Sequence, residues 1–404
     1  MTRPALLALA LVWAVPLAAA QGPPYVPPPG DWERRAPEAV GMDAERLAEA
    51  VAFAQANESD DPRDLALAHA RGFGREPYGD AVGPFLTRGP QTGVVVRHGY
   101  LVTEWGEPDR VDPTFSVAKS FLSTVAGLAV ARGAIDLDAP VWESQAPVTV
   151  LGDRGPDADP AELGTLTTFS LFEGDHNRRI TWDHLLRQTS AWQGELWGKP
   201  DWADRPSGDP DTWLTADRPA PGTVYEYNDT RVNVLALALL NVWRRPLPVV
   251  LREHVMDPIG ASPKWRWHGY RNSWVLLDGQ AVQSVSGGTH WGGGMWLTAR
   301  DQARFGLLTL RRGDWGGRQI LPDDWFTTAT TPTPAEPGYG VMNYFLNDAQ
   351  ERFPSAPASA YAHLGAGTNM VYVDPEHDLV VVARWIDRGA LDGLIERVLA
   401  SVED

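Results

Sequence analysis

The chain reads Ser116-Val117-Ala118-Lys119 and continues through Ser120-Phe121-Leu122 into an apolar stretch that runs up to Gly133. Residues three apart share one face of a helix, so a helix here places the Ser116 hydroxyl beside the Lys119 amine. Lysine is rare in this chain, with Lys199 and Lys264 as the only others. The stretch therefore predicts a nucleophile and its proton partner one helical turn apart. The alternative is a plain amphipathic helix, with Ser116 as a cap and Lys119 in solvent.

The flanks of this stretch support a helix. Asp112, Pro113 and Thr114 supply turn and cap chemistry, apolar residues then recur with helical spacing, and Gly133 suits a C-terminal cap. Ser116 then lies in the first turn, where free backbone N–H groups and the helix dipole stabilise negative charge near its hydroxyl.

Composition bounds the class of protein. The chain has 404 residues, a hydrophobic share of 43%, a formal net charge of −17 and no cysteine. That length allows two packed lobes, and the acidic balance argues against a nucleic-acid or anionic-membrane partner. The absence of cysteine excludes disulfides, thiolate nucleophiles and cysteine-based metal sites.

The N-terminus predicts export. Residues 1–20 combine Thr2-Arg3, an apolar run and Ala18-Ala19-Ala20, as in a signal peptide, and residues 21–34 form a Pro-rich leader. A membrane anchor is the alternative, but the apolar run is short and no later segment is long enough for a stable membrane span. We expect a periplasmic or secreted protein.

Strand and helix signals recur at both ends of the chain. Two hairpins and two helices are predicted, at Thr92 to Trp105, Asn369 to Trp385, Asp43 to Asn57 and Leu391 to Val402. They indicate an α/β fold of the α+β type, in which an antiparallel sheet built from both chain ends is flanked by helices. Residues 35–139 and 301–404 would form this domain. Residues 140–300, including a helix at Asn233 to Trp243, would form an inserted helical domain, and a helix at Leu297 to Leu310 would follow.

Two further segments carry chemistry that a serine nucleophile needs. Tyr227 precedes the apolar helix of the inserted part, and its pKa would fall beside a cationic Lys119. The run His363-Leu364-Gly365-Ala366 leads into the last hairpin, where small residues let a backbone N–H approach an acyl oxygen.

Together these segments resemble the penicillin-recognising serine hydrolases, in the class C β-lactamase-like branch that also holds D,D-peptidases, esterases and 6-aminohexanoate-oligomer hydrolases. Further matches in order along the chain are Gly133 to Asp138, Ile180 to Ser190 and Gly292 to Asp301. The resemblance implies a β-lactamase or penicillin-binding transpeptidase-like fold.

The resemblance also implies roles. Ser116 would be acylated, Lys119 would be its proton partner, and Tyr227 would match the tyrosine base. The backbone N–H groups of Ser116 and Ala366 would form the oxyanion hole. Substrate-binding positions would be Asp229, His363, Leu364 and Gly365. Tyr270-Arg271-Asn272 and Trp291-Gly292-Gly293 fit two of the motifs by letter but lack the right flanks.

Two residues depart from the family pattern. Asp229 replaces the usual Asn, and a carboxylate there would favour the ammonium form of Lys119 and move the base role toward Tyr227. His363 replaces a lysine that binds a carboxylate in β-lactamases, and a neutral imidazole attracts that anion less. Both changes weaken the antibiotic-hydrolase interpretation.

The sequence thus predicts a serine hydrolase that cleaves a small-molecule or short-peptide carboxylic ester or amide through an acyl-enzyme, with no cofactor and no metal. A peptidoglycan D,D-peptidase or β-lactamase is the alternative within enzymes. A penicillin-binding-like ligand sensor is the non-enzymatic alternative.

Overall fold

The computed structural model describes residues 24–153, 166–206, 212–213 and 217–403. The expected signal peptide, residues 1–20, and the start of the leader lie outside these residues. The domain boundaries given above stay predictions.

The main sheet joins the two ends of the chain, as the sequence predicts. Its strands, all paired antiparallel, run in the order β13 (Phe345–Leu346), β14 (Tyr361–Gly365), β15 (Asn369–Asp374), β16 (Leu379–Arg384), β1 (Thr92–Arg97) and β2 (Tyr100–Trp105). The central pairing sets Val95 of β1 opposite Val381 of β16. Both predicted hairpins are therefore present, and the predicted fold class is confirmed.

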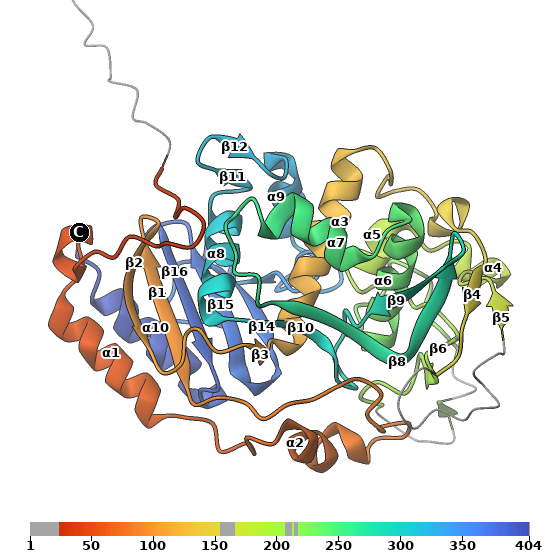
Figure 1. The fold of residues 1–404 in the computed structure, drawn as a ribbon, viewed down its shortest axis with the longest axis horizontal. Helices are drawn as coiled ribbons and strands as arrows, with labels where there is room; N and C mark the ends of the chain where they lie inside the picture. Colours follow the sequence, from red (N-terminus) through yellow and green to blue (C-terminus); the bar gives the residue numbers. More distant parts are fainter. Residues whose placement is uncertain (1–23, 154–165, 207–211, 214–216, 404) are drawn as a thin grey trace, which may run out of the picture.

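Helices cover both faces of this sheet (Figure 1). Val95 and Val381 pack in one cluster with α1 (Ala44–Ala56) and α10 (Leu391–Ala400), whereas Val94 and Val380 pack on the opposite side with α8 (Ala299–Leu310). Successive strand residues point to opposite faces, so two covered faces require strands that are apolar at every position.

The segment 140–300 differs from the expected helical lobe because it contains most of a second sheet. That sheet runs β3 (Asp112–Pro113), β10 (Gly294–Leu297), β8 (Arg266–Leu277), β4 (Val148–Val150) and β5 (Thr167–Phe169), and β9 (Gln280–Val285) pairs with β8. The register between β8 and β9 shifts between Gly269 and Trp274. Such an irregularity breaks the period-two pattern from which a strand is predicted.

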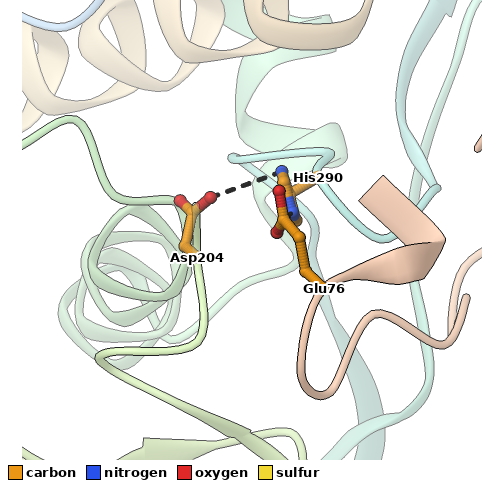
Figure 2. A group of neighbouring side chains, drawn as sticks. All are labelled: Glu76, Asp204 and His290. Atoms are coloured by element: carbon orange, nitrogen blue, oxygen red, sulfur yellow. Dashed lines mark hydrogen bonds and ion pairs between the residues drawn. The ribbon is translucent and has the colours of Figure 1, made fainter. Parts of the chain in front are cut away.

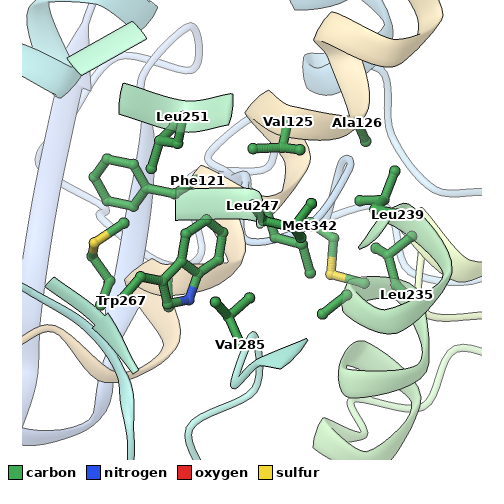
Figure 3. Close-up of a cluster of buried hydrophobic side chains, with 14 of the residues drawn as sticks. Phe121, Val125, Ala126, Leu235, Leu239, Leu247, Leu251, Trp267, Val285 and Met342 are labelled. Carbon is green, nitrogen blue, oxygen red and sulfur yellow. The ribbon is translucent and has the colours of Figure 1, made fainter. Parts of the chain in front are cut away.

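One core helix links the two parts. The side chains of α3 (Ala118–Ala131) are buried over almost its whole length. Figure 3 shows Phe121 of α3 beside Leu251 of α7 (Leu247–Leu251), and Leu235 and Leu239 of α6 (Asp229–Trp243) belong to the same buried cluster. The stretch that carries the predicted nucleophile is thus anchored in the core rather than on a surface helix.

The other elements are short. They are α2 (Leu65–Arg71), α4 (Gly174–Asn177), α5 (Trp182–Leu186), α9 (Asp323–Thr330), and the strand pairs β6 (Glu195–Leu196) with β7 (Lys199–Pro200) and β11 (Asp314–Trp315) with β12 (Arg318–Gln319). Within the described residues, no single helix is long and apolar enough to cross a bilayer, and the pair Asp229–Trp243 and Leu247–Met256, bent by 73°, passes that test only jointly.

Candidate active site

Ser116 lies on a short 3-10 turn, Phe115–Val117, directly before α3. Phe115 adopts a left-handed conformation with φ of 49°, which is unfavourable for a bulky residue and is typical of functional sites. Asp112 and Pro113 form strand β3 instead of the expected turn, and the Thr114 hydroxyl donates to the Met295 carbonyl at 3.0 Å instead of capping the helix. Strand and helix therefore fix Ser116 from both sides.

Lys119 is completely buried, and its amine has three partners. Its Nζ atom lies 2.8 Å from Ser116 Oγ, 3.0 Å from the Gly288 carbonyl oxygen and 2.7 Å from Asp229 Oδ1. Three acceptors match the three N–H bonds of an ammonium group. The alternative of a solvated lysine is therefore wrong.

Asp229 is the first residue of α6 and is held there by its neighbours. The Asn228 side chain caps α6 by accepting from the Arg231 N–H at 3.0 Å. A Cβ atom on Gly288 would come within 2.5 Å of Asp229 Cβ, so only glycine lets this loop deliver its carbonyl to Lys119. Asn233, on the same helix, accepts from the Gly287 and Gly288 N–H groups.

Burial dominates the electrostatics of the pair. Desolvation lowers the pKa of Lys119 below the usual lysine value, and Asp229 offsets that effect only in part. Desolvation acts to raise the pKa of Asp229, but the charges of Lys119 and Arg205 outweigh it and hold that pKa below its usual range. Asp229 thus favours the ammonium form of Lys119, as expected of a carboxylate at this position, but burial outweighs its effect and the net pKa is lowered.

Tyr227, and not Tyr270, lies against Ser116 and Lys119. Its ring centroid is 4.6 Å from Lys119 Nζ, and the Ser116 side chain interacts with its phenol. Tyr270, on β8, instead accepts hydrogen bonds from Asn233 of α6 and from Ser286. Desolvation, together with Asp229, raises the pKa of Tyr227 above its ordinary value. The expected fall in that pKa is therefore wrong, because burial and the nearby carboxylate outweigh the favourable contacts.

The end of β14 approaches Ser116 closely. A Cβ atom on Gly365 would lie 2.1 Å from the Thr114 carbonyl oxygen and 3.1 Å from the Ser116 nitrogen. Gly365 is followed by the exposed Ala366, and Leu364 is half-buried. This places the expected pair of oxyanion-hole residues, Ser116 and Ala366, on neighbouring segments; their role stays a prediction.

His363 lies in the core. Its imidazole is completely buried and packs against the rings of Tyr344, Phe305 and Tyr361 at centroid distances of 4.6, 5.5 and 5.7 Å. Burial lowers its pKa to about 3, so the ring is neutral. The structure therefore brings Gly365 to the nucleophile but turns the His363 side chain into the protein. Trp291, the other candidate for this motif, is also fully buried.

A chain of ionisable groups behind Asp229 was not foreseen from the sequence (Figure 2). Asp204 accepts from the backbone N–H of Asp229, and its Oδ1 lies 2.5 Å from Arg205 and 3.3 Å from His290 Nδ1. His290 Nε2 lies 2.8 Å from Glu76 Oε2. Desolvation and the charge of Asp229 raise the pKa of Asp204 to about 6.

These groups are the best candidates for a metal site among the described residues. Glu76, Asp204 and His290 each place one potential ligand atom within 4.8 Å of the others. However, the two imidazole nitrogens face different carboxylates, and Arg205 already neutralises Asp204. Coordination of one ion needs all ligand atoms to converge on one point. The geometry fits a chain of ion pairs better, and the absence of a metal and of a cofactor stays a prediction.

Periodicity could not have identified these residues. Asp204 and Arg205 lie in a segment without regular structure, and His290 lies in a loop after β9. Glu76 follows a 3-10 turn more than a hundred residues earlier in the chain. The available signal was the charge of Asp204-Arg205 inside a loop rich in Pro and Asp, which also fits an ordinary solvated loop.

The profile of the family described as Beta-lactamase matches residues 91–385, which is more than half of the chain. The chain belongs to the beta-lactamase family. A search of curated proteins found no match.

Solved structures share the fold at low identity. A penicillin-binding protein homologue from Caulobacter crescentus is 15% identical with a TM-score of 0.53, over 89% of this chain and 99% of its own. The hydrolase EstCE1 is 17% identical with a TM-score of 0.53, over 89% of this chain and 99% of its own. A putative beta-lactamase from Bacteroides dorei is 17% identical with a TM-score of 0.53, over 78% of this chain and 94% of its own. Family membership supports a hydrolase as the general kind of protein.

Proposed function

We propose that this member of the beta-lactamase family is an exported serine hydrolase that cleaves a carboxylic ester or amide through a covalent acyl-enzyme on Ser116. The observation that carries the proposal is the 2.8 Å contact between Ser116 Oγ and the Nζ atom of a fully buried Lys119. Burial lowers the pKa of Lys119, which increases the fraction of neutral amine that can accept a proton near neutral pH.

In the proposed acylation step, neutral Lys119 takes the hydroxyl proton of Ser116 while Oγ attacks the acyl carbon. Asp229 then balances the ammonium charge that forms. The Tyr227 phenol protonates the leaving alkoxide or amine, and Lys119 returns its proton to the phenolate. Backbone N–H groups of Ser116 and Ala366 stabilise the oxyanion, and water later releases the acyl group by the reverse proton path.

The position of His363 bears on the substrate. Because its imidazole is neutral and buried, this position supplies no cation for a substrate carboxylate, unlike the lysine of β-lactamases. We therefore place a neutral ester or short amide ahead of a β-lactam or a D,D-peptide. Export stays part of the proposal, because the segment that predicts it lies outside the described residues.

Intact-mass spectrometry after exposure to a fluorophosphonate, and separately to a penicillin, tests the proposal. We expect one fluorophosphonate adduct on the wild type, no adduct on Ser116→Ala, and an unchanged adduct on Ser123→Ala, a buried serine of the same helix that hydrogen-bonds only within it. Hydrolysis of p-nitrophenyl esters should fall by at least about 10³-fold in Ser116→Ala.

A lasting penicillin adduct would favour the peptidase, and rapid penicillin turnover the lactamase. No adduct from either reagent would favour the ligand sensor.

A further inference from the structure

The Tyr227 ring lies close to two cations. Besides Lys119 Nζ at 4.6 Å, the Arg205 guanidinium carbon lies 5.3 Å from the ring centroid. The Arg205 side chain is 36% exposed, in contrast to the fully buried Lys119. Cations this close to an aromatic ring favour added electron density on it, and they favour a phenolate still more.

Arg205 is held in place by the chain of ionisable groups behind Asp229. Its guanidinium binds Asp204 at 2.5 Å, and its backbone N–H donates to Glu76 Oε2 at 3.2 Å. His290 connects these two carboxylates, with contacts of 3.3 Å to Asp204 and 2.8 Å to Glu76. The side chains of Asp204 and His290 are completely buried. The connected group of Glu76, His290 and Asp204 thus holds both the backbone and the side chain of Arg205 in place.

We infer that Arg205 is a positioning residue that acts through Tyr227. The Arg205 guanidinium stabilises the negative charge that develops on the phenol oxygen as Tyr227 gives its proton to the leaving group. This inference rests on the proposed serine hydrolase. The phenol O–H bond breaks, the leaving group gains the proton, and the ammonium of Lys119 later restores the phenol.

The charges around Tyr227 explain why a second cation is needed. Two carboxylates, Asp229 and Asp204, raise the pKa of Tyr227, whereas Arg205 and the Ser116 hydroxyl lower it. Lys119 lies on the Tyr227 ring, and the uncharged rings of Tyr339 and Phe345 pack against it. Without Arg205, a phenolate would face both carboxylates with only Lys119 to compensate. Arg205 also lowers the pKa of Lys119, so it keeps more of this amine in the neutral form that can accept the Ser116 proton.

The test compares Arg205→Gln, Arg205→Lys and His290→Gln with the wild type in steady-state ester hydrolysis from pH 5 to 10. We expect Arg205→Gln to lower kcat about tenfold with little change in KM, and to move the acid limb of kcat/KM to higher pH. Arg205→Lys should recover part of the kcat lost in Arg205→Gln. His290→Gln should lower kcat and shift the acid limb as Arg205→Gln does, but by less. Arg245→Gln, in an exposed ion pair with Glu253, is the matched control and should change nothing.

Three results would overturn the inference. The first is a raised KM for carboxylate-bearing esters with unchanged kcat, which would make Arg205 a substrate-binding residue. The second is an unchanged kcat and pH profile in Arg205→Gln. The third is a stoichiometric divalent metal in the purified protein, which would take Asp204 from Arg205. Fluorophosphonate labelling of Ser116 separates the two proposals: labelling that survives in Arg205→Gln keeps the hydrolase, whereas a wild type that neither labels nor hydrolyses esters removes both.

Discussion

The ion pair between Lys119 and Asp229 gives the sharpest test of how this site is built. Nζ and Oδ1 are 2.7 Å apart, and the side chains are 0% and 1% exposed. Asp229→Asn removes the charge but keeps the shape, so the close packing of Gly288 against this residue is preserved. The variant therefore leaves a buried lysine without its counter-ion, and it also removes the longer contact of Asp229 with Arg205, at 3.9 Å.

We expect the free energy of unfolding of Asp229→Asn to fall by about 3 to 5 kcal/mol at pH 7, the usual range for removing one partner of a buried pair. The loss has a ceiling, because Lys119 can give up its proton. Neutralising a lysine whose ordinary pKa is 10.5 requires about 1.4 kcal/mol per pH unit, or about 5 kcal/mol at pH 7. Chemical denaturation followed by tryptophan fluorescence measures this loss.

The pH dependence separates loss of charge from loss of packing. In Asp229→Asn the folded-state pKa of Lys119 falls further below the unfolded value, so the unfolded chain binds more protons between the two values and stability rises with pH there. The difference in the free energy of unfolding between the wild type and Asp229→Asn should thus narrow as pH rises toward the wild-type pKa of Lys119. A packing defect would give the same deficit at every pH. The acid limb of kcat/KM should also move to lower pH.

Two further variants complete this experiment. Asp278→Asn breaks an exposed ion pair with Arg244 and should leave the melting temperature within the scatter of replicates. Lys119→Met combined with Asp229→Asn removes both charges of this pair and should be more stable than Asp229→Asn alone. Wild-type stability and an unchanged pH profile in Asp229→Asn would refute the reasoning, since Lys119 and Asp229 would then not be a charged pair.

Three other outcomes are expected. Tyr227→Phe should lower kcat/KM by about 10²- to 10³-fold with the fold intact, and full activity would exclude the phenol from proton transfer. Gly365→Ala should lower ester hydrolysis at least about tenfold, because its methyl group would collide with the Thr114 carbonyl oxygen, while Gly389→Ala, next to a flexible Asp387 side chain, should not. Between pH 6.5 and about pH 3, only the unfolded chain protonates His363, so the free energy of unfolding should fall by about 1.4 kcal/mol for each unit that the pH drops. Denaturation curves of His363→Phe should lack this part of the pH dependence.

Regular elements were predictable because they repeat a pattern along the chain. The hairpin of β1 and β2, the helix α1 with Asp43 as its cap, and the core helix α3 closed by Gly133 all occur where the sequence places them. In each case apolar residues recur with the period of the element, and a polar or glycine residue marks its end. The second sheet escaped prediction because the pairing of β8 with β9 shifts register between Gly269 and Trp274.

The site was predictable only in part, for a different reason. Ser116 and Lys119 are one helical turn apart, so local geometry alone brings them together. His363 lies two residues before Gly365 on β14, and such residues share a face in a regular strand, yet the imidazole packs in the core while Gly365 meets the nucleophile. Glu76, Asp204 and His290 come from three irregular segments, and their proximity depends on the whole tertiary structure.

The support of Arg205 gives a physical reason for the carboxylate at position 229. An asparagine there would leave Lys119 as a lone buried cation, whereas a carboxylate alone would raise the pKa of Lys119 and oppose charge on Tyr227. Arg205 contacts both Asp204 and Asp229, so its positive charge offsets the carboxylates without displacing Lys119 from Ser116. Asp229 and Arg205 therefore act as a compensated pair, in which the carboxylate stabilises the ammonium formed during acylation and the guanidinium keeps the amine and the phenol able to exchange protons. On this argument, the departure from the family's asparagine changes which residues balance the charge of the site, and it is compatible with the proposed acyl transfer on Ser116.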